Sequence, residues 1–333
     1  MLSRPYSNLD PNLILDAVES LGFRCSGALL ALNSYENRVY QIGIEDAAPL
    51  IAKFYRPARW SSEAILEEHQ FAAELAAREI PVIAPLLSSG QTLHEYQGFR
   101  FALFPRQGGR ALEFDNMDHL EWMGRFIGRL HAVGACQPFK HRMQLNLQTY
   151  GYQPYQFLLE NQFIPQDLRH NYGLAMDDIL KGIEQSFEQA GKVTYIRLHG
   201  DCHAGNVLWN DAGPWIVDLD DCLMGPAIQD IWMLLTAKTK AELDIQLDYI
   251  LSGYQEFHDF NYRELHLIES LRSLRMIHYC AWLARRWEDP SFPLNFPWFN
   301  TPRYWQEQLQ DLREQAALLA QVNDEFISNC PKD

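Results

Sequence analysis

Three side chains in the second half of the sequence have the types and the order that metal-assisted phosphoryl transfer requires. Asp201 follows His199 and Gly200, Asn206 lies a short loop further on, and Asp218 ends an apolar run. The terminal phosphates of a nucleotide carry charge that Mg²⁺ neutralises, and Mg²⁺ prefers a few oxygen ligands together with water. We therefore expect Asn206 and Asp218 to bind Mg²⁺, and Asp201 to position an acceptor hydroxyl and take its proton.

A short β-hairpin is predicted to bring the two metal ligands together. The apolar runs 207–209 and 215–217 are separated by residues 210–213, which favour a turn. Asn206 precedes the first run and Asp218 follows the second, so both are expected at the same end of the hairpin. There they can share one metal ion.

The spacing of these residues matches a kinase signature in part. The interval from Asp201 to Asn206 equals that between the catalytic Asp and the metal-binding Asn in H-R-D-L-x-x-x-N. Gly200 replaces the Arg of that signature, and Leu219-Asp220 replaces the Phe-Gly that follows the metal-binding Asp. The alternative is that these polar residues only form turns, but several elements in the right order favour the functional interpretation.

A cation in an apolar strand is the candidate contact for the nucleotide phosphates. Lys53 lies in the sequence Ile51-Ala52-Lys53-Phe54, close to the V-A-I-K pattern whose Lys contacts the α- and β-phosphates. A helix is predicted from Ser61 to Ala77, and Glu68 falls on its apolar face. Lys53 and Glu68 are therefore predicted to form an ion pair, with Glu67 as the alternative one step around the helix.

Two loops are candidates for contact with the rest of the nucleotide. The loop 33–37 contains no glycine, unlike a Gly-rich phosphate loop, and Ser34 is its expected nucleotide contact; the alternative is a plain polar turn. Residues 105–110 follow a predicted strand at 98–104 and are expected to interrupt regular structure as the hinge between two lobes. Backbone groups from Phe104 to Arg106 are expected to bind the adenine edge.

These motifs and their flanking segments resemble one known family. The loop H-G-D-x-x-x-x-N is similar to that of the aminoglycoside phosphotransferase and choline kinase branch of the protein-kinase-like fold. The closest resemblance is to the bacterial stress response kinase A group, carried by residues 32–40, 53–57, 65–71, 198–206 and 295–298. It extends from about Leu9 to Trp305. The resemblance implies ATP and Mg²⁺ as cofactors, contact of ATP near Ser34, and transfer to Ser or Thr of proteins by a cytoplasmic enzyme of the stress response.

The predicted fold is α+β and bilobal. A five-stranded antiparallel sheet with one helix on it is expected in the nucleotide-binding lobe, residues 1–105, and a mainly helical lobe that carries the catalytic loop in residues 106–333. The sequence patterns that support this fold are a helix at 12–21 after Asp10-Pro11, strand formers at 29–42 and 50–54, a helix at 118–133 with Gly124 and Gly128 for close packing, a helix from 228 with Asp230 in its first turn, helical structure at 265–287, and an ordered aromatic and proline loop at 292–299.

Composition narrows the possible partners and compartments. The formal net charge of −15 argues against a nucleic-acid partner and favours a basic acceptor segment. No run approaches the roughly 20 apolar residues of a membrane span, and the first residues lack the apolar core of a signal peptide. We therefore expect a cytoplasmic protein without a membrane partner, and a monomer.

The histidines and cysteines have simpler expected roles. His131 is expected in the core or at a helix end, His199 to anchor the catalytic loop, and His203 has no assigned role. The six cysteines have no paired spacing, so free thiols are predicted. Cys202 and Cys222 flank the site; oxidation there could alter activity, but space-filling side chains are the favoured interpretation.

The favoured function is that of a serine/threonine protein kinase. A small-molecule phosphotransferase acting on an amino alcohol or an aminoglycoside uses the same catalytic loop and is the main alternative. A nucleotide-binding regulator without turnover is a third possibility, against which the intact set of Asp201, Asn206, Asp218 and Lys53 argues.

Overall fold

The computed structural model describes residues 5–111, 116–211 and 213–329. The chain divides into two compact units, and each is described by itself. Unit 1 comprises residues 1–142, 197–223 and 233–259, and unit 2 comprises residues 143–196, 224–232 and 260–333. Every residue predicted to bind nucleotide or metal, or to act in catalysis, lies in unit 1.

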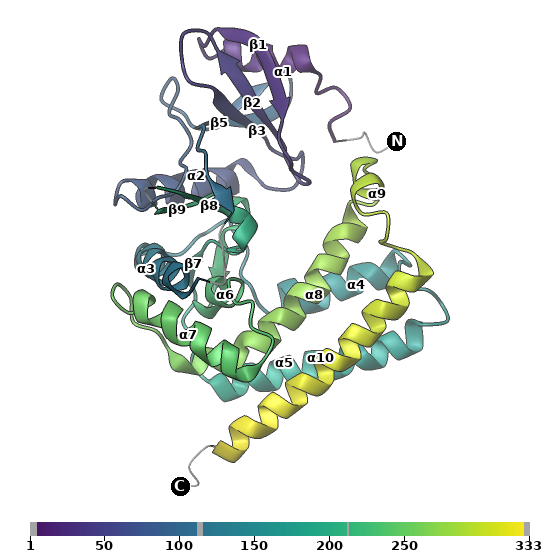
Figure 1. The fold of residues 1–333 in the computed structure, drawn as a ribbon. Helices are drawn as coiled ribbons and strands as arrows, with labels where there is room; N and C mark the ends of the chain where they lie inside the picture. Colours follow the sequence, from purple (N-terminus) through teal and green to yellow (C-terminus); the bar gives the residue numbers. More distant parts are fainter. Residues whose placement is uncertain (1–4, 112–115, 212, 330–333) are drawn as a thin grey trace. The chain divides into compact units, whose positions relative to one another are not determined.

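Unit 1 contains the predicted five-stranded antiparallel sheet, in the order β1-β2-β3-β5-β4 (Figure 1). The sheet buries an apolar core that includes Ile42, Phe54 and Phe101, against which α1 packs Ile14. The side chain of Asp10 caps α1 by accepting from the N–H of Leu13. The bounds are α1 Pro11–Glu19, β1 Cys25–Ala31, β2 Arg38–Ile44, β3 Leu50–Phe54, β4 His94–Tyr96 and β5 Phe99–Pro105.

Helix α2 (Ser62–Ala76) follows β3 and begins at the N-cap Ser61. Helix α3 (Met117–Gly134) packs closely on α7 (Lys240–Tyr254) within the same unit. A Cβ atom on Gly124 would lie 2.0 Å from the carbonyl oxygen of Ile250, and one on Gly128 would lie 2.4 Å from that of Tyr254. The predicted close packing at these two glycines is therefore present.

A second sheet, in the order β6-β8-β9, contains the predicted hairpin. Strand β8 (Val207–Asn210) pairs with β9 (Gly213–Ile216), and β6 (Arg110–Ala111) pairs with β8. The expectation that residues 105–110 lack regular structure was wrong at both ends. Pro105 still pairs with Leu50 at the end of β5, and Arg110 pairs with Trp209, because backbone partners on either side extend the strands into this segment.

Unit 2 is built mainly of helices, and α10 packs along α5 (Figure 1). The predicted helical structure at 265–287 is present as η4 and α8. The predicted loop 292–299 was partly wrong, because α9 covers residues 291–295. The bounds are η1 Leu147–Tyr152, α4 Gln153–Glu160, α5 Arg169–Ala190, α6 Ile228–Trp232, η4 Tyr262–Leu267, α8 Ile268–Arg285, α9 Ser291–Asn295 and α10 Pro302–Asn329.

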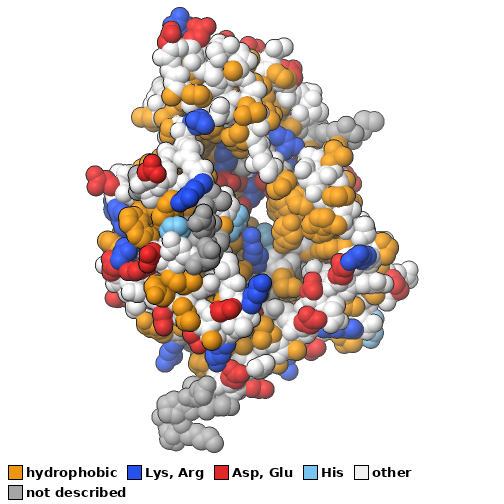
Figure 2. Space-filling model, viewed as in Figure 1, with side chains coloured by type: hydrophobic (Ala, Val, Ile, Leu, Met, Phe, Trp, Pro, Cys, Tyr) orange, Lys and Arg blue, Asp and Glu red, His pale blue; other side chains and the backbone are white. Residues whose placement is uncertain are grey.

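Hydrophobic side chains gather on the surface over α8 and α9 (Figure 2). Leu294 is 80% exposed, and Tyr279 and Trp298 are also exposed. In the described part of the chain, no helix is both long enough and apolar enough to cross a membrane.

Candidate active site

The hairpin brings the predicted metal ligands to one end. The N–H of Val217 donates to the carbonyl oxygen of Asn206 at 2.9 Å, which fixes Asp218 beside Asn206. The amide Nδ2 of Asn206 donates to the carbonyl oxygen of Asp201 (2.9 Å) and to its Oδ2 (3.4 Å). None of the described residues donates to Oδ1 of Asn206, so this oxygen can coordinate a metal ion. The structure therefore brings Asp201, Asn206 and Asp218 together.

Asp218 has a backbone conformation that is rare outside glycine. Its φ is 60° and its ψ is 67°, in the left-handed region, and its side chain is 54% exposed. Such a conformation costs on the order of 1–3 kcal/mol and persists only where the surroundings hold it. The 3-10 turn η3 (Leu219–Asp221) follows directly.

His199 anchors the catalytic loop, as predicted. Its Nε2 donates to the carbonyl oxygen of Val217 at 2.9 Å, while its Nδ1 accepts from the N–H of Asp201 at 3.3 Å. Gly200 has a φ of +85°, and a Cβ there would lie 2.3 Å from the carbonyl oxygen of Asp221. This close approach explains why a glycine stands where the kinase signature has Arg.

His203 is a site residue whose role the sequence left open. Its Nδ1 accepts from the N–H of Gly205 at 2.9 Å in the turn η2 (Ala204–Asn206), so the ring proton resides on Nε2. Nε2 lies 3.3 Å from Oδ2 of Asp201. Together with Nδ2 of Asn206, His203 therefore places a second donor at this carboxylate oxygen.

Lys53 is buried and lies between three carboxylates. Its Nζ is 3.4 Å from Oε1 of Glu68, 3.0 Å from Oδ1 of Asp218 and 3.3 Å from Oδ1 of Asp220. Burial alone would lower the pKa of Lys53, but the three carboxylates, Asp218 first, outweigh it and hold the pKa well above its usual value. Lys53 is therefore a permanent cation facing the predicted metal ligand.

The ion pair between Lys53 and Glu68 is present, and the alternative partner Glu67 has another task. Glu67 accepts from the backbone N–H groups of Lys140 (2.7 Å) and His141 (2.8 Å). Glu68 is 3% exposed on the inner face of α2, as the helical periodicity predicts.

Two further charged residues of this site, Arg59 and Arg142, were missed by sequence reasoning. Asp220 is 2% exposed, and Arg59 and Arg142 both bind it. Burial would raise the pKa of Asp220, but Arg59, then Lys53 and Arg142, hold it well below its usual range. The two arginines lie in loops far from Asp218 in the sequence, so spacing gave no signal for them.

The loop around Ser34 folds back on itself. Oγ of Ser34 donates to the carbonyl oxygen of Asn37 at 3.0 Å, and Oδ1 of Asn37 accepts from the N–H of Arg56 at 3.0 Å. Glu36 is buried, and its Oε1 lies 3.5 Å from Nε of Arg56. Contacts of its own side chains therefore hold this glycine-free loop in its conformation.

The expected hinge residues lie at the end of β5. Phe104 pairs with Ile51, and its side chain packs with the buried Tyr55 and Ile65. Arg106 follows the strand, is exposed, and donates from Nε to Oε1 of Gln41 at 2.8 Å. Contact of either residue with adenine stays a prediction.

The oxygen set at the hairpin fits Mg²⁺. Mg²⁺ is commonly bound through one or two protein oxygens, with substrate phosphates and water completing its shell. Asp218 and Oδ1 of Asn206 provide such a pair, and Lys53 lies beside them for the phosphates. Among the described residues, no group of three or more His, Cys, Asp or Glu side chains could hold a metal ion.

The cysteines of the described residues, Cys25, Cys136, Cys202, Cys222 and Cys280, are free, as predicted, and Cys330 lies outside the described residues. Cys202 and Cys222 are buried. His131 is a core residue, also as predicted, and its Nδ1 lies 3.0 Å from the hydroxyl of Tyr254.

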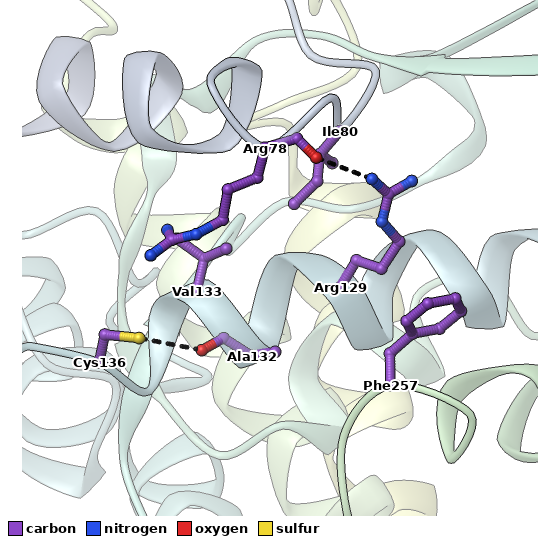
Figure 3. A pocket seen from close by; sticks show the side chains of 7 residues that line it. All are labelled: Arg78, Ile80, Arg129, Ala132, Val133, Cys136 and Phe257. Carbon is purple, nitrogen blue, oxygen red and sulfur yellow. Dashed lines mark hydrogen bonds between the residues drawn. The ribbon is translucent and has the colours of Figure 1, made fainter.

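Unit 1 also has a pocket of about 230 Å³ lined by none of the predicted site residues (Figure 3). It lies near the C-terminal ends of α2 and α3, where Arg129 donates to the carbonyl oxygen of Arg78. Its lining residues are Arg78, Ile80, Arg129, Ala132, Val133, Cys136 and Phe257.

Comparison with known proteins agrees with this geometry. Residues 29–268 match the phosphotransferase enzyme family. Stress response kinase A of Escherichia coli O157:H7 is 47% identical over 314 residues, which are 94% of this chain and 94% of that protein. The serine/threonine protein kinase RdoA of Salmonella typhimurium (strain LT2) is 46% identical, again over 94% of each chain.

A solved structure with the same fold is that of the amicoumacin kinase hAmiN in complex with AMP-PNP, Ca²⁺ and Ami. It is 20% identical, has a TM-score of 0.71, and the match covers 100% of this chain and 98% of that chain. The α+β, protein-kinase-like fold predicted from the sequence is therefore confirmed. The chain belongs to the phosphotransferase enzyme family, and within it to the stress response kinase A family.

Proposed function

We propose that this protein is a serine/threonine protein kinase that transfers the γ-phosphoryl group of ATP to Ser or Thr hydroxyls of proteins in a bacterial stress response. The observation that carries the chemistry is the buried Lys53, 3.0 Å from Oδ1 of Asp218, in the same unit as the loop that holds Asp201. The names of relatives at 46–47% identity support the protein acceptor and the stress response.

Each residue has a separate task in this proposal. Lys53 binds the nucleotide phosphates, and Glu68 orients Lys53. Asn206 and Asp218 hold Mg²⁺, which when bound neutralises phosphate charge. Asp201 orients the acceptor hydroxyl and takes its proton, and His203 and Asn206 hold the Asp201 carboxylate for that role. Ser34, Phe104 and Arg106 contact the nucleotide.

The proposal extends to the organisation and surroundings of the protein. We propose that residues 1–105 form the nucleotide-binding lobe and residues 106–333 the catalytic and substrate lobe. The protein works in the cytoplasm as a monomer, with neither nucleic acid nor membrane as a partner; the charge of −15 supports the exclusion of nucleic acid.

A small-molecule phosphotransferase remains the second candidate. The observation that favours it is the fold shared with a solved structure whose protein is named amicoumacin kinase. A nucleotide-binding regulator without turnover is the third candidate.

Product analysis separates the three candidates. The protein is incubated with Mg²⁺ and γ-labelled ATP, alone, with a basic protein, and with a panel of amino alcohols and aminoglycosides. Label on Ser or Thr of a protein supports the proposal. Label only on a small alcohol supports the second candidate, and nucleotide binding without any transfer supports the third. The control is the Asp201→Asn variant, in which transfer must be lost.

A further inference from the structure

Two buried arginines to which the proposed reaction gives no task bind the segment just after Asp218. Arg59 lies in the loop between β3 and α2, and Arg142 lies after α3; their side chains are 10% and 0% exposed. Burying a guanidinium is costly unless carboxylates or carbonyl groups satisfy it. The partners of each arginine therefore indicate what it holds in place.

Arg142 holds Glu68 through the carboxylate oxygen that Lys53 does not use. Its Nη2 donates to Oε2 of Glu68 at 2.8 Å, whereas Nζ of Lys53 binds Oε1 at 3.4 Å. Its Nη1 donates to the carbonyl oxygen of Asp220 at 2.5 Å, and its guanidinium lies 4.4 Å from the ring centroid of Trp60. One planar group thus connects α2 with the turn that follows Asp218.

Arg59 binds both carboxylates of the same turn. Its Nη1 and Nη2 donate to the side chains of Asp220 and Asp221 respectively. Asp220 is therefore shared, because its Oδ1 also lies 3.3 Å from Nζ of Lys53. The turn begins at Asp218, whose left-handed backbone needs support from its surroundings.

We propose that Arg142 and Arg59 are positioning residues for phosphoryl transfer. Arg142 acts through Glu68 on Lys53, and Arg59 acts through Asp220 and Asp221 on Asp218. The kinase signature has Phe-Gly after the metal-binding Asp, and packing of that Phe sets the active state. Leu219-Asp220 places a buried carboxylate there instead. Arg59 forms an ion pair with this carboxylate, and Arg142 donates to the backbone carbonyl oxygen of Asp220. This inference rests on the proposed function.

Arg197 offers a matched control for a purely structural role. It is 2% exposed, its Nη2 donates to Oε2 of Glu74 on α2 at 2.8 Å, and its guanidinium lies 4.5 Å from the ring centroid of Phe71. Within the described residues, Glu74 is not a partner of Lys53 or Asp218. Arg197 thus shares burial, charge and attachment to α2 with Arg142, but its side chain binds Glu74 and the carbonyl oxygens of Val133 and Gly134 instead of Glu68 or the turn after Asp218.

The first test compares Arg142→Met, Arg59→Met and Arg197→Met at a temperature where all three are folded. We expect the first two to lower kcat by about tenfold or more and to raise KM for ATP, because they release Glu68 or the turn after Asp218. Arg197→Met should lower the melting temperature but change kcat by less than about twofold. Equal losses of kcat in all three variants would overturn the inference, since burial alone would then explain them.

Double-mutant cycles test the route of each effect. If Arg142 acts through Glu68, adding Arg142→Met to Glu68→Gln lowers kcat little beyond Glu68→Gln alone. If Arg59 acts through Asp220, adding Arg59→Met to Asp220→Asn behaves in the same way. Independent, multiplying losses in both cycles would reject the positioning roles.

Hydrogen exchange separates failure of this inference from failure of the proposed function. The N–H of Cys222 donates to the carbonyl oxygen of Leu219 at 2.9 Å, so its exchange reports on the turn. Arg142→Met and Arg59→Met should speed exchange in residues 218–222, and Arg197→Met should not. A wild-type protein that transfers no phosphoryl group would reject the proposed function only. Unchanged exchange and unchanged kcat in both arginine variants would reject the inference.

Discussion

Glu67 and Glu68 are neighbours in the sequence with opposite surroundings. Glu68 is 3% exposed and binds Lys53 and Arg142, whereas Glu67 accepts two backbone N–H groups at the start of a loop. A helix turns by about 100° per residue, so adjacent side chains face different environments. Substitution of Glu68 therefore tests the site, and substitution of Glu67 is a control in the same helix.

We expect Glu68→Gln to raise KM for ATP and to lower kcat/KM by about tenfold to a hundredfold, because Lys53 loses a charged partner. Glu67→Gln keeps an oxygen acceptor and should change kcat/KM by less than about twofold. Steady-state kinetics with varied ATP at saturating Mg²⁺ measures both. A larger loss of kcat/KM in Glu67→Gln than in Glu68→Gln would show that Glu68 is not the functional partner of Lys53.

Most of the site was predictable because its residues are close in sequence or on a regular element. A hairpin links Asn206 with Asp218, Asp201 lies just before Asn206 in the sequence, and Glu68 falls on the helical period of α2. Arg59 and Arg142 were not predictable, because their contacts with Asp220 span 161 and 78 residues and follow no period. The contact of His203 with Asp201 could not be predicted either, because it depends on the backbone turn that places the ring proton on Nε2.

At the scale of elements, apolar patterns predicted strands at 29–42, 50–54 and 98–104 and several helices, whereas the number of strands in the sheet was expected from the kinase-like fold. Two of the errors fell at element ends. Pro105 and Arg110 joined strands because their partners Leu50 and Trp209 were available, which local sequence does not reveal.

A buried acid lies at another element end, the start of α6. Glu264 of η4 is 3% exposed and accepts from the N–H of Ile228 at 3.1 Å.

Burial raises the pKa of Glu264 from 4.5 to about 7, although N–H donors from Ile228 and Ala227 lower it. The native state therefore holds this proton more tightly than the unfolded state. The stabilisation is fully present below the unfolded pKa and is lost as the pH rises through about 7. We expect the free energy of unfolding to fall by up to about 3 kcal/mol across this window.

Glu264→Gln keeps the oxygen acceptor and removes the titration. Denaturant unfolding of both proteins at several pH values between 5 and 8 measures the difference. The variant should gain stability relative to wild type as the pH rises. Parallel pH profiles for the two proteins would show that Glu264 titrates normally.

At the scale of the whole molecule, the charge of −15 favours encounter with a basic acceptor. Exposed charges are screened over about 8–10 Å at physiological salt, so the effect belongs to association more than to chemistry. We expect kcat/KM for a lysine-rich protein acceptor to fall severalfold as NaCl rises from about 50 to 300 mM, with kcat nearly unchanged. An acidic acceptor such as casein is the control, and an equal fall for both would remove the role of net charge.

The most direct measurement is the rate of γ-phosphoryl transfer from ATP to protein by wild type and by Asp201→Asn, alongside the affinity of each for Mg²⁺ and a nucleotide analogue. The proposal assigns Asp201 to the acceptor and Lys53, Asn206 and Asp218 to the nucleotide and metal, so transfer should fall by about 10²-fold or more with affinity almost unchanged. Transfer that survives in Asp201→Asn would contradict the account.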